Sequence, residues 1–538
     1  MLAKAIRLYQ TVKYLKIKQF VWRVIHLLPR FQTPEKRCPK TKSIEFINII
    51  KFGITENYDR FTFLNEEKQL SIVGWDNSAL SKLWRYNLHY FDYLRQEEHQ
   101  AKRFELQQKI IENWIIENPH GKGTGWEPYA TSIRIINWIK WDFKTKGLSD
   151  EAKLSLWNQV KWLTGRIELH LLGNHLFINA KALLFACAFF KLNEHSNIYK
   201  KSLKLLKEEL KEQFLDDGAH FELSPMYHAL AMEDLLDLYQ LAPTLPSNFP
   251  SQQILKKYRL GMNWLALMRY ENDQLAHFND CANGIAPTFK ELNELSIKLG
   301  LHQAFGTCKD FFHLKESGFF VFKNKKIHLI ADIGHIGPDY LPGHAHADTL
   351  SFELAINGQR VIVNSGTSEY GLSAERLRQR STSAHSTIEL DGKSSSKVWS
   401  GFRVAERARI SELEIIERER KLEVTAVHNG YRRIASKPFH KRKWNVNDGL
   451  LEIVDEVTGS GNSVQLRYYL HPDIQIELFD DEIVLSSYKE YLAKIKTDRN
   501  LEVVETTYHD KFGSSQNNKC LLIAGTTPFK SKVSINWN

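Results

Sequence analysis

The segment TLSFELAINGQRVIVNSG, residues 349–366, decides the architecture of the second half of the chain. Apolar and polar residues alternate on both sides of Asn357-Gly358, and a period of two is typical of strands with one buried face. An Asn-Gly pair between two such runs favours a tight hairpin turn. The segment therefore predicts two antiparallel strands joined at this pair.

The same alternation continues from about Lys309 to the end of the chain, interrupted by Asn-Gly, Asp-Gly and Gly-Asn pairs. This pattern predicts a large antiparallel β region, folded as a sandwich. From about Leu83 to Leu301 the apolar residues instead recur at helical spacing, as in QQKIIENWIIENP, SIRIINWIKWDF and NAKALLFACAFFKL. Such helices in series predict an α/α barrel or solenoid. The expected domains are a lead-in segment (1–80), a helical domain (81–308) and a β-sandwich domain (309–538).

Composition limits the classes of protein that the chain can form. It has 538 residues, 43% hydrophobic and 12% aromatic, which predicts two or three globular domains with large cores. A formal net charge of +10 favours polyanionic partners. No nucleic-acid-binding module is recognisable, so nucleic acid is not predicted as a partner. The five cysteines are scattered without a C-x-x-C motif, which argues against a disulfide framework and favours a reducing compartment.

The N-terminus reads MLAKAIRLYQTVKYLKIKQFVWRVIHLLPR, residues 1–30. Lysines and arginines interrupt its apolar residues every few positions, so we expect neither a signal peptide nor a membrane-spanning helix. The pattern predicts a basic amphipathic helix. Two interpretations remain open: the helix lies on an anionic membrane surface, or it packs against the body of the protein.

Polar side chains gather where three helices are expected to begin. Asn174 and His175 follow the helix-breaking Gly173. Ser224 and Pro225 suit the cap and first position of a helix, which places Tyr227 and His228 in its first turn. The helix dipole there favours an anion, so ionisation of a tyrosine is expected to be easier. A third expected helix start carries Trp126, Glu127, Tyr129 and Arg134.

The β half contributes three histidines, His344 and His346 in PGHAHADTLSFEL and His385 in TSAHSTIELDG. An H-x-H pair and a distant histidine can hold zinc, because three protein ligands suffice for this metal. One of the histidines could equally be a general acid or base, since the pKa of imidazole lies near neutrality. The residues alone leave both hypotheses open.

Four segments, GNHLFINAKALLF, HFELSPMYHALAMEDLLDL, GHAHADTLSFEL and TSAHSTIELDG, occur in an order that resembles the heparinase II/III family of polysaccharide lyases. The resemblance runs from about Trp84 to the C-terminus. It implies an incomplete α/α toroid followed by an antiparallel β-sandwich, with a substrate cleft between them. It also implies cleavage of a uronate-containing polysaccharide by β-elimination.

The resemblance further implies roles for individual residues. Asn174, with His175 beside it, would neutralise the uronate carboxylate, and Tyr227 and His344 would act as acid and base. A structural zinc would be bound by His346, His385 and the residue at position 364, where an asparagine stands instead of the family's aspartate. Asp348 is the alternative third ligand. The substrate-binding residues that we expect are Trp126, Glu127, Tyr129, Arg134 and His228, with Trp126 stacking on a sugar and Arg134 holding a carboxylate.

Two other functions remain as hypotheses. A glycoside hydrolase needs two carboxylates beside the scissile bond, and Glu127, Glu222 and Asp280 are the candidates. A glycan-binding protein of surface-polysaccharide production could keep the fold without catalysis. The N-terminal sequence favours a cytoplasmic protein, or one peripheral at the inner membrane face, over a periplasmic one. The sequence does not specify an oligomeric state.

Overall fold

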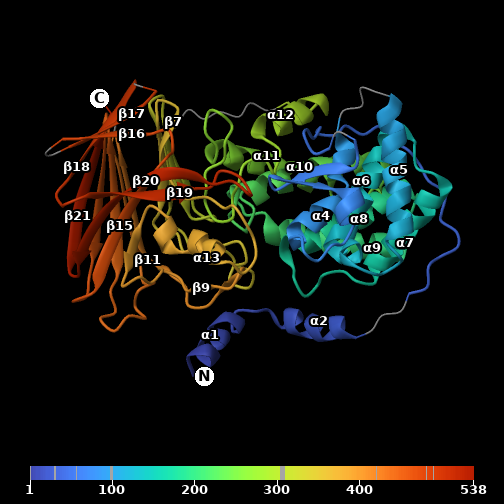
Figure 1. The fold of residues 1–538 in the computed structure, drawn as a ribbon, viewed down its shortest axis with the longest axis horizontal. Helices are drawn as coiled ribbons and strands as arrows, with labels where there is room; N and C mark the ends of the chain where they lie inside the picture. The colour runs from blue at the N-terminus through green and yellow to red at the C-terminus, as the bar shows by residue number, and fades with distance from the viewer. Residues whose placement is uncertain are drawn as a thin grey trace.

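The protein has a helical half and a β half that lie side by side (Figure 1). The computed structural model describes all residues except 1, 29–31, 56, 97–100, 303–308, 420, 480–481, 489 and 538. The chain starts with a lead-in segment, whose elements are α1 (Leu2–Val12), α2 (Ile17–Leu27), β1 (Arg60–Phe63), β2 (Glu66–Gln69) and α3 (Leu70–Val73). In Figure 1, α1 and α2 run along the lower edge of the molecule, α1 nearer the β half and α2 below the helical half.

The helical half follows the predicted order. Its helices are α4 (Lys82–Tyr90), α5 (Ala101–Glu117), α6 (Pro128–Thr145), α7 (Asp150–Thr164), α8 (Gly173–Phe189), α9 (Asn197–Gln213), α10 (Pro225–Leu241), α11 (Ser251–Leu267) and α12 (Phe289–Lys298), with short 3₁₀ turns η1 (Asp92–Arg95), η2 (Thr124–Trp126) and η3 (Ala242–Thr244). Their inner faces share one apolar core, which includes Trp114, Trp138 and Leu183. Helical periodicity thus identified the elements because each buries one apolar face.

Local sequence fixes the start of the helix that carries Tyr227. The Ser224 hydroxyl accepts a hydrogen bond from the Tyr227 amide at 3.3 Å, and Pro225 occupies the first helical position of α10. Ser224 also donates to the Asp280 carbonyl oxygen at 2.6 Å, which ties this helix start to the loop between α11 and α12. The predicted cap is therefore confirmed, and it has a second partner.

The β half consists of two large antiparallel sheets packed face to face. Its strands are β3 (Phe311–Leu314), β4 (Phe319–Lys323), β5 (Ile327–Asp332), β6 (Phe352–Ile356), β7 (Gln359–Val363), β8 (Ile388–Leu390), β9 (Val398–Trp399), β10 (Arg403–Val404), β11 (Ile410–Arg418), β12 (Lys421–His428), β13 (His440–Asn447), β14 (Leu450–Val457), β15 (Ser463–Leu470), β16 (Gln475–Leu478), β17 (Ile483–Ser487), β18 (Glu490–Thr497), β19 (Glu502–Tyr508), β20 (Gln516–Thr526) and β21 (Phe529–Asn536), and α13 (Ala374–Arg380) and η4 (Thr382–Ala384) lie between β7 and β8.

One sheet has the strand order β11-β12-β13-β14-β21-β18-β17-β16, and the other has the order β19-β20-β15-β7-β6-β5-β4-β3, with β8 paired to β15. A single core, which includes Leu354, Trp444 and Leu466, is filled from both sheets. The hairpin predicted at 349–366 is confirmed: β6 and β7 pair antiparallel, and Asn357 and Gly358 both have positive φ, at 51° and 78°. The predicted fold class, a helical region followed by an antiparallel β-sandwich, is confirmed.

The predicted boundary between the helical and the β domain, at residues 308 and 309, lies in a part of the chain that is only partly described. The last helix of the helical half ends at Lys298 and the first strand of the β half begins at Phe311, while residues 303–308 are outside the described part. Cys38, Cys187, Cys281 and Cys520 are free thiols, and Cys308 lies outside the described residues. In the described part of the chain, no helix has both the length and the apolar character needed to cross a bilayer.

Candidate active site

Tyr227, in the first turn of α10, meets the β half at His344. The two rings are 4.1 Å apart between centroids, and His344 comes from the long loop between β5 and β6. The Tyr227 hydroxyl forms a hydrogen bond of 3.0 Å with the Tyr370 hydroxyl. The two halves of the chain therefore place a phenol and an imidazole in contact, as the resemblance implied.

The protonation state of Tyr227 differs from the sequence-based expectation. Burial and the neighbouring Tyr370 raise the pKa of Tyr227 well above its ordinary value, and the negative charge of Asp280 acts in the same direction. Helix-dipole stabilisation was expected to favour the phenolate, but desolvation outweighs it. Tyr227 is therefore a neutral phenol that can donate a proton.

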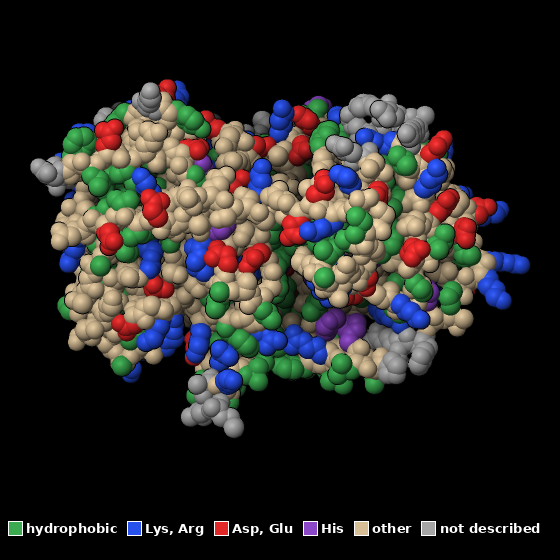
Figure 2. Space-filling view, viewed as in Figure 1, with side chains coloured by type: hydrophobic (Ala, Val, Ile, Leu, Met, Phe, Trp, Pro, Cys, Tyr) green, Lys and Arg blue, Asp and Glu red, His purple; other side chains and the backbone are tan. Residues whose placement is uncertain are grey.

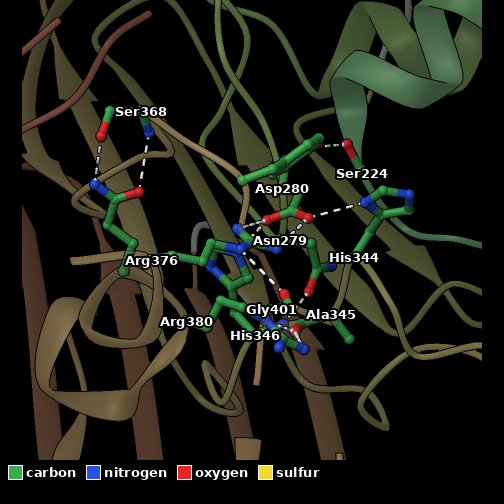
Figure 3. Close-up of polar contacts among 12 residues, drawn as sticks. Ser224, Asn279, Asp280, His344, Ala345, His346, Ser368, Arg376, Arg380 and Gly401 are labelled. Atoms are coloured by element: carbon green, nitrogen blue, oxygen red, sulfur yellow. Dashed lines mark hydrogen bonds and ion pairs between the residues drawn. The ribbon is translucent and has the colours of Figure 1, made fainter. Parts of the chain in front are cut away.

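Asp280, from the loop between α11 and α12, is the hub of the site (Figure 3). Its side chain is fully buried, and it contacts His344 Nδ1 at 2.9 Å, His346 Nε2 at 2.8 Å and both terminal nitrogens of Arg376. Burial favours the neutral acid, yet Arg376 and the bonds from the two histidines hold the pKa of Asp280 well below its usual range. Asp280 is therefore a carboxylate that accepts a hydrogen bond from His344 Nδ1–H.

This arrangement fixes the tautomer of His344. Because Nδ1 donates to Asp280, a neutral His344 carries its lone pair on Nε2. Nε2 is 3.9 Å from Glu222 Oε2, and the imidazole is about one-fifth exposed. His344 therefore presents a proton-accepting nitrogen on the partly open side of the site.

Glu222 links His344 to the start of α8. Its Oε1 accepts from the Asn174 backbone amide at 3.3 Å, and its Oε2 accepts no hydrogen bond although the side chain is buried. The Asn174 side-chain amide donates to the Tyr129 hydroxyl at 3.3 Å. Asn174 thus contacts both Tyr129 and Glu222. Through Glu222 it belongs to the same cluster of polar side chains as His344.

His175 lies beside Asn174 and is paired with the buried carboxylate of Glu168. Its Nδ1 is 3.1 Å from Glu168 Oε1, and its ring is 4.4 Å from the ring of Tyr129. Burial disfavours the imidazolium, but Glu168 more than compensates and raises the pKa of His175 above its ordinary value. Asn174 and His175 together therefore offer an amide donor and an imidazole whose cationic form Glu168 stabilises.

His346 and His385 face each other in a way that fits a metal ion. His346 Nε2 donates to the Asp280 carboxylate, and His385 Nδ1 donates to the Ser381 carbonyl oxygen at 2.8 Å. The remaining nitrogens, His346 Nδ1 and His385 Nε2, are 3.1 Å apart and both carry lone pairs. Burial lowers the pKa of His346 to about 4 and that of His385 well below its usual value, so a proton does not fill this gap near neutral pH.

The third predicted ligand fits a metal less well. Asn364 Oδ1 accepts a long hydrogen bond of 3.3 Å from the Ser386 amide, and Asn364 Nδ2 is buried without a partner. Within the residues that the structure describes, no three His, Cys, Asp or Glu side chains form a metal-binding group. Asp348 is buried, and burial raises its pKa to about 6; burial and the charge of Asp348 raise the pKa of the neighbouring Asp332 well above its ordinary value. The donor set is thus two imidazoles and, at most, a neutral amide.

Three of the predicted substrate-binding residues, Trp126, Arg134 and His228, are buried with partners other than the polar side chains around His344. Trp126 packs among Trp114, Trp162 and His120. Arg134 is fully buried and donates to Gln159 Oε1 at 2.9 Å and to the Gly125 carbonyl oxygen at 2.7 Å, with its guanidinium over Trp114.

His228 is fully buried as well. It accepts from the His220 amide at 3.0 Å and contacts the Gly261 carbonyl oxygen at 2.8 Å. All the polar partners that the structure gives to Arg134 and His228 are internal, so these two side chains serve the helical core. The sequence placed both residues near helix starts, but it does not show which side chains will face the core once the helices have packed.

Glu127 and Tyr129 lie on the side of the site formed by α4 and α6. Glu127 Oε2 accepts from the Tyr86 hydroxyl and is 2.8 Å from Lys82 Nζ. Tyr129 contacts Asn174 and His175, and its ring is 5.9 Å from that of Tyr90. Of the five residues predicted to bind substrate, Tyr129 has direct side-chain contacts with the catalytic candidates Asn174 and His175.

Residues of the site that were missed from the sequence include Glu168, which pairs with His175, and Tyr370 and Arg376 of the β half. Tyr370 binds the Tyr227 hydroxyl, and Arg376, on α13, is fully buried against Asp280. Both come from the connection between β7 and β8, where the sequence SEYGLSAERLRQR shows no motif. Only the pairing with an aspartate almost a hundred residues earlier gives Arg376 its role.

Comparisons with known proteins agree with this architecture. The family model "Heparinase II/III N-terminus" matches residues 84–295, and the model "Heparinase II/III-like, C-terminal" matches residues 307–538. The fold and site thus define a two-domain protein of the toroid and sandwich class, with a tyrosine–histidine pair between the domains. The chain belongs to the heparinase II/III family.

Two curated relatives, both named heparin-sulfate lyase, match part of the chain. The relative from Bacteroides stercoris is 24% identical over 351 residues, which are 55% of this chain and 46% of the relative. The relative from Pedobacter heparinus is 27% identical over 249 residues, or 41% of this chain and 36% of the relative. The chain thus matches less than half the length of each.

Solved structures resemble the chain over most of its length. A heparinase III structure has a TM-score of 0.66 and 16% identity, and the match covers 91% of this chain and 82% of that one. A chondroitin AC lyase from Streptomyces coelicolor has a TM-score of 0.51 and 9% identity, with 85% and 74% covered. At these identities the likeness establishes the fold, a helical toroid followed by a β-sandwich.

Proposed function

We propose that the protein is a polysaccharide lyase that cleaves an acidic, uronate-containing polysaccharide by β-elimination. The observation that carries the proposal is the contact between Tyr227, a neutral phenol from the helical half, and His344, whose Nε2 lone pair is fixed by Asp280. A proton donor and a proton acceptor at one point are what an elimination requires. Family membership and the curated heparin-sulfate lyases support the same class of reaction.

The first chemical requirement is to acidify the C5 proton of the uronate. Removal of this proton places negative charge on the adjacent carboxylate, and donors already oriented toward that charge provide the largest catalytic contribution in such sites. Asn174 Nδ2 and the His175 imidazolium, which lie side by side at the start of α8, are the groups that we assign to this task. Tyr129, between them, orients the Asn174 amide.

The second requirement is to transfer two protons. We assign His344 Nε2 as the base that takes the C5 proton and Tyr227 as the acid that gives its hydroxyl proton to the O4 leaving oxygen. The C5–H and C4–O bonds break, a C4=C5 double bond forms, and the new chain end carries the phenol's proton. Asp280 stabilises the resulting imidazolium through the 2.9 Å bond to Nδ1.

A glycoside hydrolase on the same scaffold is disfavoured by the state of the candidate carboxylates. Hydrolysis needs one carboxylic acid and one carboxylate beside the bond. Asp280 is fully buried and bound by Arg376 and two histidines, and Glu127 is bound by Tyr86 and Lys82. Glu222 has a buried carboxylate oxygen, Oε2, that accepts no hydrogen bond, but the other two candidate carboxylates are already paired with Arg376 and Lys82.

We also propose that His346 and His385 bind a structural divalent cation, with zinc as the metal that suits two imidazoles. The facing lone pairs support this assignment, and Asn364 is the third ligand that we propose. Such an ion would hold His346, and through Asp280 the orientation of His344. It takes no part in the elimination itself.

The test is a turnover assay with the full chain. Heparan sulfate, heparin, hyaluronan, chondroitin sulfate and alginate are offered separately, and ultraviolet absorbance reports the unsaturated uronate that only elimination creates. Tyr227→Phe removes the proposed acid, and Tyr488→Phe, at a position 74% exposed in the β half, is the matched control. We expect the signal with at least one substrate, its loss in Tyr227→Phe and its retention in Tyr488→Phe.

The alternatives give different results in the same assay. New reducing ends without the absorbance would indicate hydrolysis and refute the mechanism. Retained elimination in Tyr227→Phe would refute the assignment of the acid. Binding without any product from all five polysaccharides would favour the glycan-binding alternative.

A further inference from the structure

The N-terminal strap, residues 2–28 with α1 and α2, is attached to the protein by polar and aromatic contacts. On α1, the Thr11 hydroxyl accepts a hydrogen bond of 3.1 Å from the Trp399 indole of the β half. On α2, the buried Gln19 side chain donates to the Tyr340 carbonyl oxygen at 3.4 Å. The His26 ring lies 4.0 Å from that of His170 in the helical half. The strap therefore has a defined inner face.

The outer face of the strap is apolar, which is the reverse of an ordinary surface helix. Nine of the 21 exposed large hydrophobic side chains in the described part of the chain belong to it: Ile6, Leu8, Tyr9, Ile17, Phe20, Val21, Val24, Leu27 and Leu28. On α2 they recur three or four positions apart and form one stripe, with Ile17 81% and Leu27 84% exposed. Figure 2 shows green and blue side chains together along this lower edge.

Positive charge accompanies the stripe. Lys4, Arg7, Lys13, Lys16, Lys18 and Arg23 lie within the strap, and the first acidic residue of the chain is Glu35. An apolar face flanked by cations and free of acidic residues has the composition of a helix that lies in the interface of an anionic membrane. A second copy of the strap is a poor partner, because pairing would bring two sets of like charges together.

We propose that the outer face of the N-terminal strap docks the protein on an anionic lipid surface. The inner contacts already hold α1 and α2 against the two halves, so docking requires no rearrangement of the fold. The apolar stripe enters the boundary between headgroups and acyl chains, and the exposed cations Lys4, Lys13, Lys18 and Arg23 contact lipid phosphates, whereas Lys16 is paired with Glu212 of the protein. This inference is independent of the proposed catalytic activity.

Docking would also place the candidate site near the membrane. The loop that carries His344 begins after β5 and includes Tyr340, which α2 contacts. The Lys16 ammonium lies 3.7 Å from the centre of the Tyr340 ring, and the next residue, Leu341, packs at Gly173 at the start of α8. The docked face and the site therefore share one loop.

The test uses the full chain and vesicles of defined composition. Co-sedimentation is measured with vesicles of phosphatidylglycerol and phosphatidylcholine and with vesicles of phosphatidylcholine alone. The variant Val24→Glu/Leu27→Glu changes two side chains that are 64% and 84% exposed, and Ile72→Glu/Leu372→Glu, at 78% and 82%, is the matched control. We expect binding to the anionic vesicles only, weakened at least about tenfold in the strap variant and by added salt, and unchanged in the control.

Several results would overturn the proposal. Equal binding of the strap variant and the wild-type chain would show that the stripe is not the docking face. Failure of the wild-type chain to bind anionic vesicles would refute docking itself. If the wild-type chain instead forms a dimer by light scattering, and the strap variant does not, the stripe is an interface between copies and the lipid assignment is wrong.

Discussion

Replacing Asp280 with asparagine is expected to lower both the stability of the fold and the catalytic rate. Asp280 and Arg376 are both fully buried and paired through two hydrogen bonds, while the Arg376 Nε donates to the Gly401 carbonyl oxygen at 3.2 Å. Removing one charge of a buried pair typically costs about 3–5 kcal/mol, because the other charge stays uncompensated. The guanidinium keeps Gly401 and lies 4.9 Å from the Tyr370 ring, so we expect a loss near the lower limit, about 3 kcal/mol.

The second consequence concerns His344. An amide at position 280 can present its NH₂ group to Nδ1, which favours the wrong tautomer and places the proton on Nε2. In a well-studied serine protease the corresponding loss of a histidine-orienting aspartate lowers kcat about 10⁴-fold. For Asp280→Asn we expect a fall in kcat of at least about 100-fold, with a smaller change in KM.

A double variant distinguishes the two effects. Asp280→Asn/Arg376→Met removes both charges, and replacing both partners of a buried pair by neutral groups is often nearly neutral for stability. Urea unfolding should therefore show most of the lost stability restored, while kcat in the absorbance assay stays low. A double variant with wild-type kcat would refute the role of Asp280 in orienting His344. A single variant with wild-type stability would refute the uncompensated-charge argument.

Three further predictions address other parts of the site. Arg134→Met should lower the free energy of unfolding by about 2–4 kcal/mol, because its carbonyl and amide acceptors lose their buried donor, and any surviving activity should keep its KM. Glu168 raises the pKa of His175, so the His175 imidazolium is present below that pKa and is lost as pH rises through it. Activity should therefore fall over that pH range, and Glu168→Gln should move this fall to lower pH. Elemental analysis of the purified chain should find one divalent cation per molecule, and His385→Ala should abolish cation binding and lower the unfolding temperature. A wild-type chain that contains no metal and is as stable as His385→Ala would contradict the proposed ion.

Part of the site could be predicted because its residues stand at recognisable places in the chain. Ser224 and Pro225 mark a helix start, which placed Tyr227 in a first turn, and Gly173 did the same for Asn174. The polar segment before β6 placed His344 at the mouth of a strand. Cap chemistry and periodicity are local, so they are present in the sequence whatever the rest of the fold does.

The same local signals failed for Trp126, Arg134 and His228. Trp126 and His228 lie at helix starts and Arg134 lies in the second turn of α6, yet Arg134 and His228 are fully buried with internal partners, and Trp126 is packed among aromatic rings. Whether a first turn faces the core or the site depends on how the helix is rotated against its neighbours. That rotation is set by tertiary packing and not by the position of a residue within its helix.

The sequence by itself determined the order of helical and β regions, the hairpin at Asn357-Gly358, and the candidacy of Asn174, Tyr227 and His344, because hydrophobic period, turn chemistry and capping act over a few residues. Tertiary structure alone decided that Asp280 joins His344, His346 and Arg376, that desolvation keeps Tyr227 a phenol, and that the apolar side of α2 faces outward. Each of these depends on groups far apart in the chain that meet only after folding. Charge pairing and burial therefore arise only in the folded chain, since charge pairing depends on the distance between the groups and burial on the exclusion of water.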